Sequence, residues 1–87
     1  MSLEAGFLLR KLQRGESVPM PHARPMPTIG RRCCELRVVD RDSTWRIVCR
    51  LDDDAIVIAE VFAKKTAKTP STVIEICQKR LQEYDDA

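Results

Sequence analysis

The sequence predicts an α+β fold: a three-stranded antiparallel β-meander with one helix before it and one helix after it. Apolar residues recur at helical spacing near both ends of the chain. Between residues 34 and 62, three segments either alternate between apolar and polar residues or are continuously apolar. Short aspartate-rich turns join these segments, as in an antiparallel meander. At 87 residues the chain is expected to form a single domain, residues 1–87.

The first helix is expected over residues 3–14, with Gly15 as its C′ residue. Its predicted apolar face consists of Ala5, Leu8, Leu9 and Leu12. Residues 16–32 hold four of the five prolines, so this stretch is expected to be an extended connector without regular structure.

The three strands are expected over residues 34–39, 44–51 and 55–62. Turns at residues 40–43 and 52–54 separate them. The third segment is apolar on both faces apart from Glu60, which is typical of a central strand covered on both sides.

The last helix is expected to begin at Thr69, because threonine is a good N-cap residue and Pro70 suits the first helical position. The helix is amphipathic, and its predicted apolar face consists of Val73, Ile74, Cys77, Leu81 and Tyr84.

The four cysteines indicate reduced core thiols of a cytoplasmic protein rather than a metal site. They form no CxxC pair, and the single histidine lies far from them, so the spacing of a zinc site is absent. Cys34 follows Arg31 and Arg32, which would lower its pKa, but it alternates with apolar residues, which favours burial. No apolar run of about 20 residues is present, so no membrane span is expected. No cofactor is expected.

Basic residues of two kinds are expected to share one surface. Arg37, Arg46 and Arg50 occupy the same side of adjacent strands. Lys64, Lys65 and Lys68 follow the third strand, and extended geometry would point Lys64 and Lys65 to opposite sides. Because the net charge is only +2, a nucleic-acid interface would depend on this local concentration. The surface suits RNA or DNA phosphates, and the alternative is a solvated face whose arginines pair with carboxylates.

Metal-free RNA cleavage uses the adjacent 2′-hydroxyl as nucleophile and requires a base, an acid and cations around the phosphate. Tyr84 or Glu35 could transfer protons, although Tyr84 could equally be a helix-packing residue. His22 has a near-neutral reference pKa, but a proline-rich loop also suits a plain surface residue.

Several motifs together resemble the RelE/ParE superfamily, and most of all its phage-derived, HigB-like branch of toxin–antitoxin toxins. The motifs are Glu35-Leu36-Arg37, Trp45-Arg46-Ile47 with Arg50, Val61-Phe62-Ala63-Lys64-Lys65-Thr66 with Lys68-Thr69-Pro70, Arg80-Leu81 with Glu83-Tyr84, and residues 4–9 and 20–27 near the N-terminus. The resemblance covers nearly the whole chain.

This resemblance implies a toxin that pairs with a helix-turn-helix antitoxin and cleaves mRNA on the ribosome without a metal. The residues expected to take part in catalysis are Arg37, Arg46, Lys64, Lys65 and Tyr84. Those expected to bind RNA are Arg50, Lys68, His22 and Arg24.

Two departures from the superfamily leave a second hypothesis open. The chain begins without the extra N-terminal strand of related sequences, so a sheet edge would be exposed to a partner or to a second copy in a homodimer. Cys34 and Cys49 stand where related sequences carry His and Tyr. The alternative is therefore a non-catalytic binding protein, either a ParE-like gyrase poison or a degenerate toxin that only binds its antitoxin.

Overall fold

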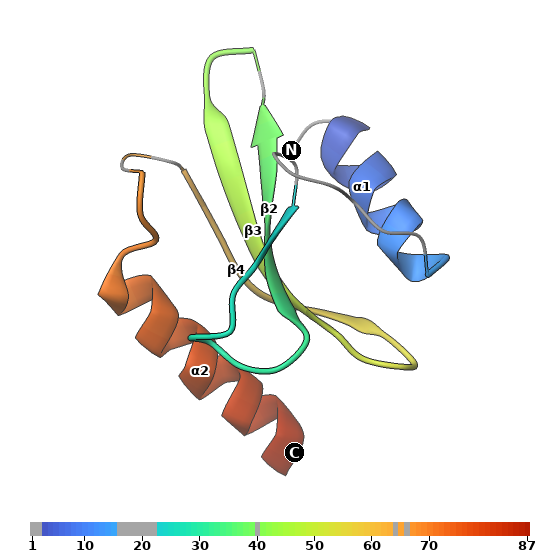
Figure 1. Ribbon diagram of the computed structural model, residues 1–87, viewed down its shortest axis with the longest axis vertical. Helices are drawn as coiled ribbons and strands as arrows, with labels where there is room; N and C mark the ends of the chain where they lie inside the picture. The colour runs from blue at the N-terminus through green and yellow to red at the C-terminus, as the bar shows by residue number, and fades with distance from the viewer. Residues whose placement is uncertain (1–2, 16–22, 40, 64, 66) are drawn as a thin grey trace.

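The computed structural model describes residues 3–15, 23–39, 41–63, 65 and 67–87, and these form two helices and one antiparallel sheet of four strands (Figure 1). In chain order the elements are α1 (Leu3–Gln13), β1 (Ala23–Pro25), β2 (Cys33–Val39), β3 (Thr44–Leu51), β4 (Ile56–Ala63) and α2 (Ser71–Asp86). The strand order β1-β2-β3-β4 follows the chain. The α+β prediction is confirmed, but the sheet has four strands rather than three.

The strand that the sequence did not predict is β1, which lies within the proline-rich segment. Its three residues pair with β2 through Ala23 and Leu36, Arg24 and Glu35, and Pro25 and Cys34. Proline lacks a backbone N–H, so it is tolerated in a strand only at a sheet edge or a bulge. β1 is such an edge, which explains how a strand forms where the prolines argued against one.

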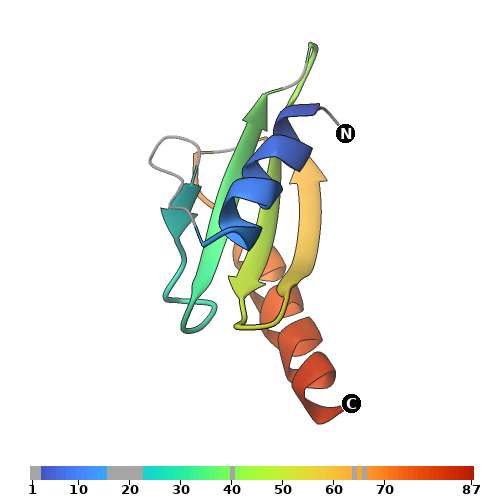
Figure 2. The ribbon, with the colours of Figure 1, turned by 90° about the vertical axis from the view of Figure 1, so that its right-hand side faces the viewer.

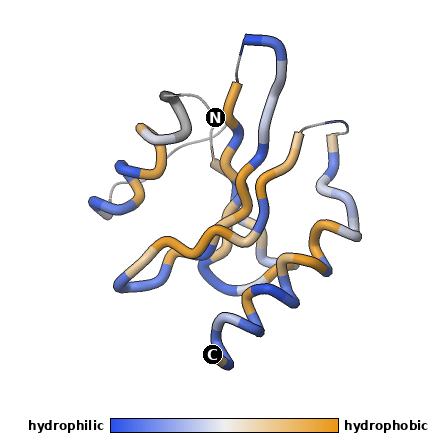
Figure 3. The backbone as a smooth tube through the Cα atoms, turned by 180° about the vertical axis from the view of Figure 1, so that it is seen from behind, coloured by the Kyte–Doolittle hydropathy of each residue, from blue (hydrophilic) through white to orange (hydrophobic). Residues whose placement is uncertain are grey.

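The two helices cover opposite faces of the sheet, so the molecule has three layers (Figure 2). One core cluster, beside α1, consists of Leu8, Cys34, Leu36, Val38, Ile47 and Cys49. The other, beside α2, consists of Met26, Ile29, Cys33, Val48, Ala59, Cys77 and Leu81. Apolar side chains therefore cover both faces of the sheet. Along α2, apolar and polar residues alternate (Figure 3).

β4 is an edge strand, and the prediction of a central strand is wrong. Its residues are apolar on both sides because α1 and α2 both contact it. A register shift opposite Val48 and Cys49 leaves Ala59 as an extra, bulged residue, since Val48 pairs with Glu60 and Cys49 with Ile58. Arg80 of α2 donates a 2.9 Å hydrogen bond to the carbonyl of Ala59, which ties the helix to the bulge.

The helix ends agree with the sequence in one case and differ in the other. Gly15 has a positive φ of 78° and donates its N–H to the Leu12 carbonyl, as expected of a C′ residue. At the start of α2, Pro70 rather than Thr69 occupies the N-cap position, and no side chain caps the helix. The Thr69 hydroxyl donates instead to Glu35, a charged acceptor. Within the described residues, no helix is both long and apolar enough to cross a bilayer.

Candidate nucleic-acid interface

The carboxylate of Glu35 joins three parts of the chain next to the start of α2. Arg46 on β3 places Nη1 2.9 Å from Glu35 Oε1, and Arg24 on β1 donates to the same oxygen at 3.2 Å. The Thr69 hydroxyl donates to Oε2. Only 5% of the Glu35 side chain is exposed. Glu35 therefore holds two arginines and the segment preceding α2 in fixed positions.

Arg46 is a buried structural cation, with 7% of its side chain exposed. Its Nη2 donates to the Ala67 carbonyl at 3.2 Å, which fixes the loop between β4 and α2. Its Nη1 makes the ion pair with Glu35 and has no hydrogen-bond partner among the described residues. Arg46 thus holds the neighbouring residues in position from the buried side and is nearly inaccessible to solvent.

Arg37 lies directly opposite Arg46 in the β2–β3 register and is half-buried. Its Nε atom is buried, and no hydrogen-bond partner for it exists among the described residues. Glu35 pairs with Arg24 and Arg46, and Arg37 adds a third arginine beside Arg46, so this part of the surface carries excess positive charge.

The accessible cations of this cluster are Arg24, Lys65 and Lys68. The Arg24 side chain is 42% exposed although it is anchored on Glu35. Lys65 and Lys68 are exposed in the loop that Arg46 fixes at Ala67. We call Arg24, Glu35, Arg37, Arg46, Lys65, Lys68 and Thr69 the cation cluster. An anion that approaches the cation cluster would meet exposed cations whose positions are held by buried ion pairs.

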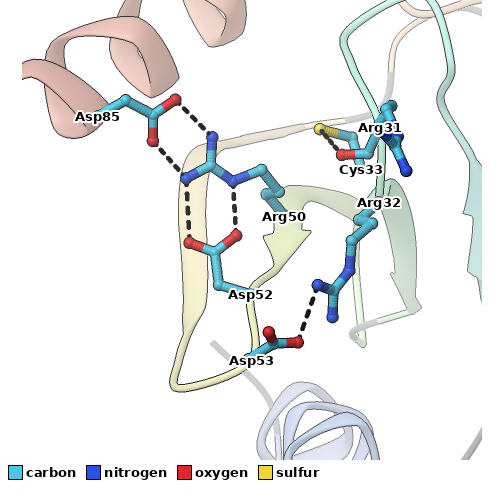
Figure 4. Close-up of polar contacts among 7 residues, drawn as sticks. All are labelled: Arg31, Arg32, Cys33, Arg50, Asp52, Asp53 and Asp85. Atoms are coloured by element: carbon cyan, nitrogen blue, oxygen red, sulfur yellow. Dashed lines mark hydrogen bonds and ion pairs between the residues drawn. The ribbon is translucent and has the colours of Figure 1, made fainter.

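Arg50 lies at the other end of α2, between two aspartates (Figure 4). It donates to Asp52 at 2.7 and 3.0 Å and to Asp85 at 2.9 and 2.7 Å. These hydrogen bonds raise the pKa of Arg50 and lower the pKa of both carboxyls. Arg50 therefore connects the β3–β4 turn to the last turn of α2, and RNA binding by Arg50, which stays a prediction, would have to displace these carboxylates.

Tyr84 belongs to the Arg50 end of the molecule and not to the cation cluster. The Arg50 guanidinium lies 5.9 Å from the centre of its ring, and the side chain is 51% exposed. Its predicted place on the packed face of the helix is therefore wrong. Since a helix rises about 1.5 Å per residue, Tyr84 is about 20 Å along α2 from Ser71. The predicted catalytic residues thus fall into two groups rather than one cleft. Lys64 and His22 lie outside the described residues.

All four cysteines are free and buried, as predicted. Burial raises the pKa of Cys33, and it raises the pKa of Cys77 to about 11. The pKa of Cys34 is lowered, but by its hydrogen bond with Cys49 rather than by Arg31 and Arg32. In the part of the chain that the structure describes, no group of three or more His, Cys, Asp or Glu residues could hold a metal ion.

Sequence reasoning expected one surface to hold Arg37, Arg46, Arg50, Lys64, Lys65 and Lys68, and it expected Arg24 to bind RNA. It missed the contacts that organise the cluster. The role of Thr69 was hidden because its hydroxyl suited a helix cap equally well. The Glu35–Arg24 contact needed the unpredicted strand β1. One signal could have revealed the role of Glu35. A lone carboxylate in a region rich in arginines is expected to pair with them.

The fold and the cation cluster define a small α+β protein that carries a cluster of positive charge at the start of α2. Residues 2–82 match the model of the phage-derived Gp49-like protein family (DUF891). The chain belongs to this family, which is a RelE-like, toxin-like family. Comparison with curated proteins gives no match, and comparison with solved structures gives none either.

Proposed function

We propose that this protein is the toxin of a type II toxin–antitoxin system, of HigB-like type, and that it binds RNA through the cation cluster. Its activity is metal-independent cleavage of mRNA on the ribosome, in the cytoplasm, and its partner is a helix-turn-helix antitoxin. Membership of a toxin-like family supports the class of protein. The observation that carries the RNA proposal is the exposed Arg24, held on a buried carboxylate beside the lysine loop.

Preorganisation is what makes this cluster suited to a phosphate. A flexible surface arginine loses side-chain entropy when it binds an anion, whereas Arg24 is already held by Glu35 and bonds to Thr69 at 3.4 Å. Its guanidinium still has donors free for a phosphate oxygen, because a guanidinium carries five N–H groups. RNA in this position would also lie against the loop with Lys65 and Lys68.

Cleavage at this surface would use the 2′-hydroxyl of the RNA and the cations of the cluster. Negative charge grows on the phosphate oxygens in the transition state, and fixed cations stabilise it more than they stabilise the substrate. Glu35 anchors cations, so a separate group must accept the proton. His22 immediately precedes β1 in the sequence and is the candidate closest in the chain to Arg24.

A second function, non-catalytic binding, is favoured by one specific observation. Tyr84 is far from the cation cluster, and Glu35 is already engaged, because it forms ion pairs with two arginines and accepts a hydrogen bond from Thr69. A toxin that only binds its antitoxin, or a ParE-like gyrase poison, needs the basic surface but no proton-transfer group.

Inducible expression in bacteria followed by RNA sequencing tests the proposal. We expect growth arrest with mRNA ends that map within translated codons, and the same ends when purified protein acts on programmed ribosomes in EDTA. The triple variant Arg24→Ala/Lys65→Ala/Lys68→Ala should lose both effects. Its matched control, Arg10→Ala/Lys11→Ala/Lys79→Ala, removes the same number and kinds of charge from α1 and α2 and should remain toxic.

Three other outcomes would overturn parts of the proposal. DNA damage without RNA ends would establish the gyrase function. Toxicity that survives the triple variant would exclude the cation cluster as the RNA site. Absence of toxicity together with tight antitoxin binding would establish the binding-only function.

A further inference from the structure

Cys34 and Cys49 form a close thiol pair inside the sheet. They are directly opposed in the β2–β3 register, and their Sγ atoms lie 3.4 Å apart. Opposed residues of antiparallel strands have Cα atoms about 4.5–5.5 Å apart, which falls within the range of about 4.4–6.8 Å found for disulfides. The backbone is thus already in position for a bond between them, and only the sulfurs must move closer, to about 2.05 Å.

We propose that Cys34 and Cys49 are a reversible oxidation site, which a small hydroperoxide converts to an intramolecular cross-strand disulfide. The other two cysteines have different neighbours. Cys33 Sγ contacts the Arg31 carbonyl at 3.6 Å, and Cys77 packs in the core cluster on the opposite face of the sheet. The proposal concerns the pair beside α1 and is independent of the RNA function.

A route to the pair exists from solvent. A cavity of about 780 Å³ lies between the end of α1, β1 and the β3–β4 turn, and Cys34 is part of its lining. Leu12, Arg24 and Leu51 line the same cavity. Cys34 is 9% exposed whereas Cys49 is fully buried. A peroxide would therefore meet Cys34 first, and large reagents would be excluded from Cys49.

The hydrogen bond within the pair assigns the two chemical roles. The hydrogen bond between the two thiols lowers the pKa of Cys34, while the same bond and burial raise the pKa of Cys49. The thiolate is the reactive form, so Cys34 is the attacking sulfur and Cys49 the resolving one.

The reaction balances with one hydroperoxide. The Cys34 thiolate attacks a peroxide oxygen, the O–O bond breaks, and the leaving hydroxide takes up a proton to become water. Cys34 is then a sulfenic acid. The Cys49 sulfur attacks the Cys34 sulfur, the S–O bond breaks, and a second water leaves with the Cys49 proton. The two thiols lose two electrons and two protons in total, and hydrogen peroxide is reduced to two waters.

Peptide mapping of the full-length protein tests the proposal directly. After treatment with hydrogen peroxide, the denatured protein should show two free thiols instead of four, and dithiothreitol should restore all four. Trypsin places Cys34 in peptide 33–37, Cys49 in peptide 47–50 and Cys77 in peptide 69–79. We expect a linked species of the first two peptides. Oxidation should also raise Tm by about 15 °C, because the bond closes a loop of about 15 residues.

The variant Cys33→Ala/Cys77→Ala identifies the sulfurs, because peptide 33–37 then contains only Cys34. It should lose both remaining thiols and give the same linked peptides. For the native protein, four surviving thiols at a peroxide dose that oxidises free glutathione completely would overturn the proposal. A linkage through Cys33 or Cys77, or disulfides found only between two chains, would overturn it as well.

Discussion

At the scale of single residues, the cation cluster depends on Glu35. Two arginines share its carboxylate, and both Glu35 and Arg46 are nearly inaccessible to water. Removing one partner of a buried ion pair leaves an uncompensated charge in a medium that solvates it poorly. The stability of the fold and the position of Arg24 are therefore linked through one side chain.

We expect Glu35→Gln to lower the free energy of unfolding by about 3 kcal/mol, measured by chemical denaturation at pH 7, because Arg46 loses its counter-charge. The matched control is Glu60→Gln, which breaks the Arg80–Glu60 ion pair, whose side chains are 53% and 24% exposed. That change should cost less than about 1 kcal/mol. Equal costs for the two variants would contradict a special role for Glu35.

Arg50 makes the stability of the protein depend on acidity. Its hydrogen bonds lower the pKa of Asp52 and Asp85 below the ordinary value of 3.8. Each carboxylate therefore contributes its full stabilisation of the fold at pH values above this ordinary pKa. The stabilisation is lost as pH falls through the lowered pKa of the folded protein. We expect the difference in Tm between the native protein and Arg50→Met to shrink as pH falls from about 6 to about 2.

The control for this pH dependence is Arg32→Met, which breaks the exposed ion pair between Arg32 and Asp53. Its Tm should stay close to that of the native protein at every pH. A Tm difference for Arg50→Met that is constant with pH would show that Arg50 stabilises the fold by packing alone.

The sequence predicts the position of a residue well when its contacts are local in the chain, and poorly when they are made by distant segments. The alternation of the strands correctly put Glu35, Arg37, Arg46 and Arg50 on one side of the sheet. It could not show that α2 covers this side, nor that Asp85, 35 residues beyond Arg50, meets it. Strand periodicity is local, whereas the choice of carboxylate for each arginine is set by tertiary packing.

At the scale of elements, β4 is the strand most open to a partner. It lies at the edge of the sheet, and Ile58 is 50% exposed. An apolar edge strand with unpaired backbone groups can pair with another strand. Apolar residues on both faces predicted a central position for β4, but two covering helices produce the same pattern at an edge. β1 was not predicted because the prolines around it indicated a connector, whereas the structure pairs it with β2.

We propose that a second copy pairs along β4, and we expect Ile58→Lys to convert the dimer to a monomer in sedimentation equilibrium. The charge would have to be buried between the two edges. Ile76→Lys is the matched control, since Ile76 is 40% exposed on α2. A mass that is the same for the native protein and Ile58→Lys would contradict pairing along this edge.

At the scale of the whole molecule, charge is distributed unevenly. The net charge is +2, yet the two ends of α2 differ in sign, with the cation cluster at its start and Asp52, Asp53 and Asp85 near its end. RNA binding should therefore depend on a few local contacts rather than on a general attraction.

We expect the logarithm of the RNA association constant to fall with the logarithm of salt concentration at a slope of about −2. Three phosphate contacts, by Arg24, Lys65 and Lys68, would each release about 0.7 counterion from single-stranded RNA. Arg24→Ala should reduce the slope to about −1.4, whereas Arg10→Ala should leave it unchanged. Fluorescence anisotropy of a labelled oligonucleotide measures it, and equal slopes for both variants would exclude Arg24 from the interface.

The order of the strands has a consequence for how quickly the protein folds. Because β1, β2, β3 and β4 are neighbours both in the chain and in the sheet, each strand finds its partner within one short loop or connector. Small loops cost little entropy to close, and chains with mostly local pairing cross their folding barrier fast. The sheet therefore needs no distant segment before it can form.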